Sequence, residues 1–409
     1  MKKILILFLV SLTVLFSACS KEKPAKTTIK FSSWGSKSEV PILTNLINEF
    51  EQQNPNIKVE FIHIPQNYFQ KLHLLFASNL EPDVVFINNI YAKTYIKADM
   101  LEDITPYFKN EISNNIFFDS AIKAFSSDGK TYAIPRDISN LVIYYNKNIF
   151  DKNKISYPKS DWTLNDLQTK ALKTTTNNNF AINYEGDSLY WLYYLAANGG
   201  GILSDDTRKI IINSIKSKEG IRFYSSLSNN LHVAPTKAQK GSMTSAQMFI
   251  EGKLAMYLGG RWMVPKFRET LSFDWDIVNF PASKENKLPI DASGWALSKK
   301  SNNKKEAIQL IKFLSSKASI TKITESGLII PARKDVAYSN NFLSKTKKPE
   351  HSILFIDVLK YSKPTAVNSN YPQINDILNQ ELEPVFNGSK NVSNVFTPKL
   401  LKQLNELTE

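Results

Sequence analysis

Strand and helix patterns alternate along the first part of the chain. Residues 28–31 form a short strand pattern, and apolar residues then recur at helical spacing across 40–50. Apolar and polar residues alternate across 57–61, as in a half-buried strand, and a second helical pattern covers 69–76. The run 84–87 is entirely apolar, which is typical of a strand buried on both faces. This β-α-β-α-β order predicts an α/β fold with an open, mainly parallel sheet flanked by helices.

Polar and aromatic residues follow the ends of these predicted strands. Trp34 comes after the first strand, Gln66 after the second, and Asn88 and Tyr91 after the third. In open α/β sheets, ligands bind beyond the carboxyl ends of the strands. The positions of these residues therefore predict one wall of a ligand site.

Later segments repeat the same kinds of pattern. Residues 132–146 read as a strand, a break and a second strand, and Thr163 is placed to cap a helix. Residues 254–258 form a short apolar strand before a turn at 259–260, and another strand pattern lies within 290–300 before a helix. No internal repeat interrupts this order.

The N-terminus has the pattern of an export signal. Two lysines precede a mainly apolar run over residues 4–16, and small residues precede Cys19. The run is shorter than the roughly 20 residues that cross a bilayer. The stretch Phe-Ser-Ala-Cys resembles a bacterial lipobox, although Phe stands where Leu is usual. We expect residues 1–18 to be a signal peptide, Cys19 to be lipidated and residues 19–28 to tether the protein to the outer face of a membrane. The alternative is an ordinary secretory signal that ends near a cysteine.

Length and charge limit the classes of protein further. The chain has 409 residues, which is too long for one ordinary core and favours two lobes. It carries 51 Lys and Arg against 38 Asp and Glu, a formal net charge of +13. The lysines are scattered among asparagines, and the chain has an export signal, so we expect no nucleic-acid partner. No later segment approaches 18 consecutive apolar residues, so no membrane-spanning helix is expected.

The sequence lacks the motifs of common enzymes and metal sites. Its four histidines form no pair at metal-ligand spacing and it has one cysteine, so we expect no metal. It has no Gly-x-Ser-x-Gly elbow, P-loop or Gly-x-Gly-x-x-Gly motif, so we expect neither a nucleotide cofactor nor enzyme activity. Carboxylates are plentiful, however, so counting them leaves a glycosidase acid pair open.

Aromatic residues in predicted loops are the chemistry that the sequence does offer. Aromatic faces pack on the C–H faces of sugar rings, while Asn, Asp, Gln and Arg form hydrogen bonds with sugar hydroxyls. The alternative is that each Trp fills the core of its lobe. The candidates are Trp34, Tyr91, Trp162, Trp191, Trp262, Trp295 and Tyr371.

Nine short segments, taken in order, carry a resemblance to a known family. They are residues 31–35, 82–85, 98–104, 132–135 with 144–147, 162–163, 249–256, 259–262, 293–299 and 327–333. With these segments the chain resembles the family 1 extracellular solute-binding proteins, which are the sugar-binding lipoproteins of ABC transporters. The likeness covers nearly the whole mature chain.

The resemblance implies a two-lobed periplasmic-binding-protein-like fold of type II, in which each lobe is a mainly parallel sheet flanked by helices. Three crossings should join the lobes, near residues 134–137, 291–294 and 330–335. The N-lobe would then comprise residues 29–135 and 292–333, and the C-lobe residues 136–291 and 334–409. We expect a monomer that delivers its ligand to the membrane subunits of an ABC permease, with a separate ATPase supplying energy.

The resemblance also implies a ligand site between the lobes. We expect Trp34, Asn88, Tyr91 and Trp295 on the N-lobe side, Asp137, Trp191, Trp262 and Tyr371 on the C-lobe side, and Gly294 and Arg333 at the crossings. The neighbouring Arg136 and Asp137 could bind ligand or bridge the lobes.

A sugar or oligosaccharide is the expected ligand, and three alternatives stay open. A glycerol phosphodiester would use an arginine cluster, for which Arg136, Arg261 and Arg333 are candidates. A polyamine would need several carboxylates, of which Asp137 is the evident one. An exported glycoside hydrolase would show turnover of an oligosaccharide. The sequence does not specify the sugar, the permease or the membrane.

Overall fold

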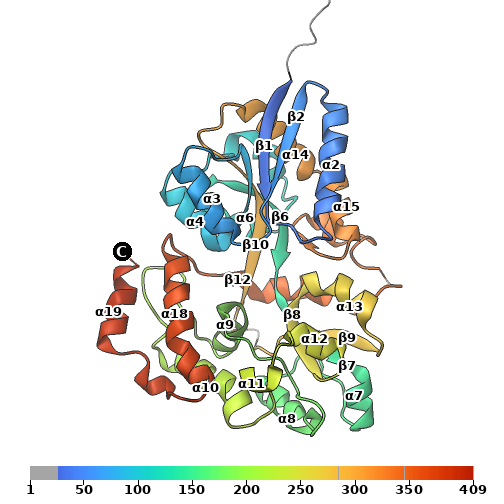
Figure 1. Ribbon diagram of the computed structural model, residues 1–409, viewed down its shortest axis with the longest axis vertical. Coiled ribbons are helices and arrows are strands. Elements are labelled where there is room, and N and C mark those ends of the chain that lie inside the picture. Colours follow the sequence, from blue (N-terminus) through green and yellow to red (C-terminus); the bar gives the residue numbers. More distant parts are fainter. Residues whose placement is uncertain (1–25, 284, 345, 409) are drawn as a thin grey trace, which may run out of the picture.

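The computed structural model describes residues 26–283, 285–344 and 346–408. The predicted signal peptide, residues 1–18, and the predicted lipidation site, Cys19, lie outside the described residues. Within the described part, no helix combines the length and apolar character that crossing a membrane requires. Figure 1 shows two lobes, one above the other, with strands β6 and β10 at their junction.

The first lobe is built on the larger sheet and is called the large-sheet lobe here. Its strand order is β11-β6-β10-β3-β1-β2, with β12 also paired to β10. The strands are β1 (Thr27–Ser33), β2 (Ile57–His63), β3 (Val84–Asn88), β6 (Ala133–Ser139), β10 (Leu288–Leu297), β11 (Ile330–Pro331) and β12 (Ser362–Pro364). The helices around this sheet are α2 (Val40–Gln53), α3 (Tyr68–Ala77), α4 (Asn89–Lys97), η1 (Thr105–Tyr107), α5 (Lys109–Ser113), α6 (Asp119–Ala124), α14 (Lys304–Leu314) and α15 (Lys317–Glu325), with a small hairpin of β4 (Ser126–Ser127) and β5 (Lys130–Thr131).

The first five elements of this lobe follow the predicted order. β1 pairs in parallel with both β2 and β3, and α2 and α3 lie between them in the chain. Residues 84–87 are fully buried, which explains why that run carries no polar residue. β1 begins at Thr27, so the last two residues of the predicted tether belong to this strand. The predicted α/β fold class is confirmed, but the sheet is mixed and not mainly parallel, because β10 pairs antiparallel with β3 and β6, and β11 pairs antiparallel with β6.

The second lobe, called the small-sheet lobe here, contains the sheet β8-β7-β9. Its strands are β7 (Leu141–Asn146), β8 (Met256–Gly260) and β9 (Trp275–Asn279). Its helices are α7 (Lys147–Lys152), α8 (Leu164–Thr174), α9 (Ser188–Ala197), α10 (Ile215–Asn229), α11 (Lys237–Lys240), α12 (Ser245–Ile250), η2 (Arg261–Met263), α13 (Val264–Thr270), α16 (Lys334–Ala337), α17 (Leu354–Asp357), η3 (Val358–Tyr361), α18 (Tyr371–Phe386), η4 (Val392–Asn394) and α19 (Pro398–Glu406).

The small sheet differs from the expected parallel arrangement. β7 pairs antiparallel with both β8 and β9. The central strand β7 follows β6 after a single residue, Asn140, and its two neighbours both run in the opposite direction. An antiparallel sheet of three strands with helices around it is still buried on both faces, so the apolar pattern of β7 looks like that of a parallel strand.

The segments at the three expected crossings lie side by side at the junction. β10 pairs with β6 from Asp291 opposite Ser139 onward, and β11 pairs with β6 through Ile330 opposite Ile138. A Cβ atom on Gly294 would lie 2.3 Å from the Ile134 carbonyl oxygen, so the close approach of β10 and β6 requires glycine there. β12, which the sequence analysis did not single out, adds a fourth segment beside β10. The exact lobe boundaries stay a prediction.

Candidate functional site

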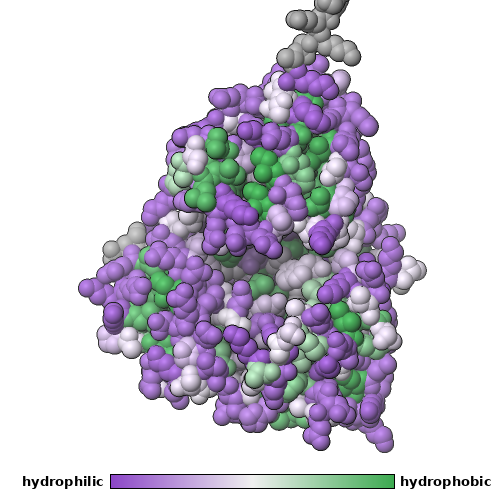
Figure 2. All heavy atoms as spheres, in the orientation of Figure 1, coloured by the Kyte–Doolittle hydropathy of each residue, from purple (hydrophilic) through white to green (hydrophobic). Residues whose placement is uncertain are grey.

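A cavity of about 500 Å³ lies between the two lobes and is called the interlobe cleft here. Figure 2 shows the hollow between the halves of the molecule. Both lobes and the crossing strands contribute side chains to it. The lining includes Trp34, Glu39, Asn88, Arg136, Asp137, Leu189, Arg261, Trp262, Lys266, Asp291 and Ser293.

A strip of aromatic rings on the large-sheet lobe begins at the cleft, where Trp34 is the ring that lines it. Trp34 follows β1 and packs against Phe86 and Phe69, with ring centroids 4.3 and 5.5 Å apart. Phe69 in turn stacks on Tyr91 at 3.8 Å and 12°. All three rings of the strip, Trp34, Phe69 and Tyr91, are partly exposed. Sequence reasoning missed Phe69 because its helical spacing indicated a core position.

Tyr91 lies on the side of the large-sheet lobe that faces the other lobe. Burial raises the pKa of its hydroxyl, and the negative charges of Asp376 and Asp187 raise it further. Asp187 caps α9 of the small-sheet lobe, where its side chain accepts the Leu189 N–H at 2.8 Å. The aromatic strip thus ends close to carboxylates of the opposite lobe.

Asn88 combines a structural bond with a free donor. Its Oδ1 accepts the Tyr91 N–H at 3.2 Å and so caps α4. Among the described residues its amide NH₂ has no hydrogen-bond partner, and the side chain lines the cleft. The Asn88 side chain therefore caps α4 through its oxygen and leaves its NH₂ group as a free donor at the cleft.

A buried ionic cluster forms the floor of the large-sheet side. The Arg136 guanidinium donates to the carboxylates of Asp137 and Glu39 and packs over the Phe86 ring, 4.1 Å from its centroid. Burial alone would lower the pKa of Arg136, but the two carboxylates raise it above its usual value. Burial raises the pKa of Asp137, against the opposing effect of Arg136. The positive charge of Arg136 is therefore already neutralised without a ligand.

Glu39 explains the geometry of this cluster. It is the residue before α2, and its side chain turns to Arg136 instead of capping the helix. The Arg136–Asp137 pair is thereby tied to the large-sheet lobe, and its carboxylate oxygens border the cleft. No local sequence pattern indicates Glu39, because it lies 97 residues before its partner Arg136.

Trp262 provides the main aromatic surface of the small-sheet lobe. It lies in η2, directly after β8, and is partly exposed in the cleft. Its ring covers Gly260, where an added Cβ would lie 1.9 Å from the indole Cζ3. The predicted turn at 259–260 is the end of β8, and η2 makes the turn.

Arg261 is a buried cation with neutral partners. Its Nε donates to the Gly327 carbonyl oxygen at 3.1 Å and its Nη1 to the Ser352 hydroxyl at 3.3 Å. Its guanidinium also packs over Phe342 and Phe355. Burial lowers the pKa of Arg261 to about 9. Within the described ranges no carboxylate forms an ion pair with it.

Asp291 lies on β10 at the junction of the lobes. Its Oδ1 accepts hydrogen bonds from the Asn89 side chain at 3.1 Å and from the Thr365 hydroxyl at 2.8 Å. Burial raises the pKa of Asp291, and these two hydrogen bonds oppose that shift. Sequence reasoning missed this residue.

Two predicted ligand residues are core residues instead. Trp295 is fully buried beside Phe86, because the part of β10 around it is buried. Trp191 is fully buried because α9 is apolar on most of its sides. Trp191 donates to the Asn379 side chain at 3.2 Å. The alternative in which a Trp fills the core of its lobe holds for both, and these two predictions were wrong.

Four further predicted residues, Tyr91 among them, lie outside the cleft lining. Arg333 pairs with Asp335 at 3.0 Å, and Tyr371 lines a different cavity. Gly294 serves the close approach of β10 to β6. The structure therefore brings Trp34, Asn88, Asp137 and Trp262 together around the cleft, with Tyr91 beside them.

One group of possible metal ligands lies elsewhere, at Asp276, Glu350 and His351, with ligand atoms within 4.8 Å of one another. Lys147 and Lys348 already pair with Glu350, and His351 bonds to Asp276. We interpret the group as an ion-pair network.

Comparisons with known proteins agree with this architecture. Residues 45–350 match the family described as bacterial extracellular solute-binding proteins. A solved ABC substrate-binding protein of Listeria monocytogenes in complex with cycloalternan is 27% identical, with a TM-score of 0.83, and the match covers 94% of this chain and 98% of that one. The galactooligosaccharide-binding protein of Bacillus subtilis is 22% identical over 90% of this chain and 87% of its own. The multiple sugar-binding protein of Streptococcus mutans is 26% identical over 78% and 80%.

Proposed function

The chain belongs to the family of bacterial extracellular solute-binding proteins, and we propose that it is the sugar-capturing component of an ABC importer. This family membership places it among binding proteins and not among enzymes. The proposed ligand is a sugar or oligosaccharide held between the two lobes. The oligosaccharide- and sugar-binding relatives support that ligand class.

The observation that carries the proposal is a pair of indole rings from opposite lobes in one cavity. Trp34 lines the cleft from the large-sheet lobe and Trp262 from the small-sheet lobe. Aromatic faces pack on the apolar faces of sugar rings, and each Å² of apolar area removed from water contributes about 25 cal/mol. Trp34 also packs against Phe69, which stacks on Tyr91, so neighbouring rings support the position of the Trp34 indole.

The polar groups around these rings suit sugar hydroxyls. Asn88 offers an amide donor, and the carboxylates of Asp137, Glu39 and Asp291 offer acceptors. A ligand that contacts both lobes at once binds the closed form better and shifts the hinge equilibrium toward closure. Solvent exclusion on closure strengthens the same hydrogen bonds.

We further propose that the closed protein delivers its ligand to the membrane subunits of an ABC permease. Lipidation at Cys19 would hold the protein at the outer face of the membrane, with residues 20–26 as the link to β1. Family membership supports an extracytoplasmic location.

An anionic solute is the second candidate, and Arg261 is the observation that favours it. A buried charge without an opposite charge is costly, and an anionic ligand would supply one. The other two arginines considered for this role have carboxylate partners, Asp137 and Glu39 for Arg136 and Asp335 for Arg333.

The test is a thermal-shift screen followed by calorimetry. A ligand that binds the native state alone raises the melting temperature. We expect neutral mono- and oligosaccharides to include the strongest stabiliser, and uronic acids and glycerol phosphodiesters to be weaker. Trp262→Ala should weaken sugar affinity by about tenfold or more, equivalent to about 1.4 kcal/mol. Tyr338→Ala removes an exposed aromatic ring outside the cleft and is the matched control.

Two results would count against the proposal. An unchanged calorimetric affinity in Trp262→Ala would remove the role of that indole. A screen in which acidic solutes stabilise the protein and neutral sugars do not would favour the second candidate.

A further inference from the structure

A second cavity, of about 470 Å³, lies in the small-sheet lobe beneath β12 and the segment that leads to α18. It shares no lining residue with the interlobe cleft. Its volume falls within the range of about 300–1,000 Å³ that is usual for small-molecule sites. The hydrogen bond from Thr365 to Asp291 connects its wall to the crossing strand β10.

Apolar side chains form much of this second cavity. Ile202 and Leu203 are buried at its base, and Leu192, Ile211 and Pro289 complete the apolar surface. Such a surface favours the apolar body of a ligand over a sugar, whose hydroxyls would lose hydrogen bonds there.

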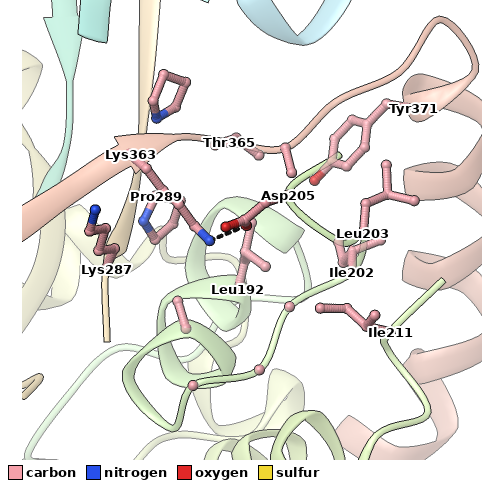
Figure 3. Close-up of a pocket in the computed structure, with 16 residues that line it drawn as sticks. Leu192, Ile202, Leu203, Asp205, Ile211, Lys287, Pro289, Lys363, Thr365 and Tyr371 are labelled. Carbon is pink, nitrogen blue, oxygen red and sulfur yellow. Dashed lines mark hydrogen bonds and ion pairs between the residues drawn. The ribbon is translucent and has the colours of Figure 1, made fainter. Parts of the chain in front are cut away.

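Tyr371 adds a polar group to the wall of the cavity. Its side chain is 2% exposed, and Figure 3 shows its hydroxyl directed into the cavity. Within residues 26–283, 285–344 and 346–408 this hydroxyl forms no hydrogen bond with another side chain or the backbone, so it is free to bond a molecule in the cavity. A ligand oxygen in the cavity would supply the missing partner.

The side opposite Tyr371 carries positive charge. Lys287 and Lys363 both line it, and Lys363 forms an ion pair with Asp205 (Figure 3). Within the described ranges Lys287 has no ion pair, so the group of three has a net charge of +1. This charge favours a ligand with a single negative group.

We propose that this cavity is a second binding site, which takes a small organic monocarboxylate with an apolar body. The apolar part lies on Leu192, Ile202 and Leu203, and the carboxylate is bound by Lys287 and Lys363. Asp205 competes with the ligand for Lys363, so the exposed Lys363–Asp205 ion pair lowers the affinity of the site for the carboxylate. The site is independent of the sugar proposed for the interlobe cleft.

The probe is 4-phenylbutyrate, titrated into the full mature chain by isothermal calorimetry, with its neutral amide for comparison. We expect saturable binding of one acid per chain and much weaker binding of the amide. Lys287→Gln and Tyr371→Phe should each weaken binding by about threefold to tenfold, as expected for one partly exposed ion pair or one hydrogen bond.

Asp205→Asn is the sharpest variant, because it should strengthen binding by releasing Lys363. Partial unfolding cannot produce a gain of affinity. Because the Asp205 side chain is exposed, we expect the substitution to leave the fold unchanged. Trp262→Ala is the matched control and should leave the affinity for phenylbutyrate unchanged. Three results would overturn the proposal: no saturable binding, equal binding of the amide, or loss of binding in Trp262→Ala with Lys287→Gln unaffected.

Discussion

At the residue scale, Gly260 makes room for the indole of Trp262. Its backbone has φ −93° and ψ 177°, which any residue adopts, so glycine is needed there for space and not for conformation. The 1.9 Å gap between an added Cβ and the ring is far below van der Waals contact. The ring position thus depends on a residue that does not itself offer a side chain to the ligand.

Gly260→Ala should therefore impair binding more than folding. The methyl group displaces the indole from its position in the lining of the cleft, and we expect sugar affinity to fall by about tenfold. Gly186→Ala is the matched control, since an added Cβ there meets nothing within 4 Å. Calorimetry gives the affinity and circular dichroism the melting temperature. Equal affinities for the two variants would contradict the positioning role.

The tryptophans show what sequence reasoning does and does not provide at this scale. Trp34 and Trp262 follow strand ends, and both line the cleft. Trp191 and Trp295 were also expected in loops, yet they lie in α9 and β10 and are fully buried. The difference is whether the ring lies within a buried element or just beyond it, and predicted element ends carry an uncertainty of about two residues or more.

At the element scale, β10 carries a partly buried carboxylate, that of Asp291, at the junction of the lobes. Burial raises the pKa of Asp291, so the folded protein binds a proton there more tightly than the unfolded chain does. The stability from this group is complete below the unfolded pKa of about 3.9 and is lost as pH rises through the raised folded pKa. At neutral pH the ionised carboxylate therefore opposes folding.

Asp291→Asn should stabilise the protein at neutral pH. The amide oxygen still accepts the hydrogen bonds from Asn89 and Thr365, while the partly buried charge is removed. We expect a higher melting temperature than that of the unsubstituted protein at pH 7.5 and a shrinking difference as pH falls toward 4. Melting curves by circular dichroism across this range measure it. Asp161→Asn, at an exposed aspartate, controls for loss of charge, and a pH-independent difference would contradict the prediction.

The elements themselves were predictable where periodicity was strong. The order from β1 to β3 and the cap at Thr163 follow from apolar spacing and capping residues. The antiparallel direction of the small sheet did not follow, since a buried strand has the same apolar pattern in either direction. β12 is three residues long and gave no periodic signal.

At the scale of the whole molecule, the cleft depends on contacts between residues far apart in the chain. Asn89 and Asp291 are 202 residues apart, and Arg136 and Glu39 are 97 apart. No local sequence pattern indicates such pairs. The two-lobed fold was predicted from the resemblance to a family, whereas Glu39 and Asp291 were not predicted as site residues. The same limit explains why Tyr371 was placed in the wrong cavity.

The arrangement of Trp34 and Trp262 on different lobes predicts a change of shape on binding. A ligand gains contacts with both indoles only when the lobes approach, so its binding energy favours the closed form. We expect the radius of gyration from small-angle X-ray scattering to decrease when the sugar identified by the thermal screen is added at saturation. A sugar that fails to stabilise the protein is the control and should leave the scattering unchanged. If calorimetry shows saturation while the scattering curve stays the same, the lobes do not move and the site binds its ligand as a preformed cavity.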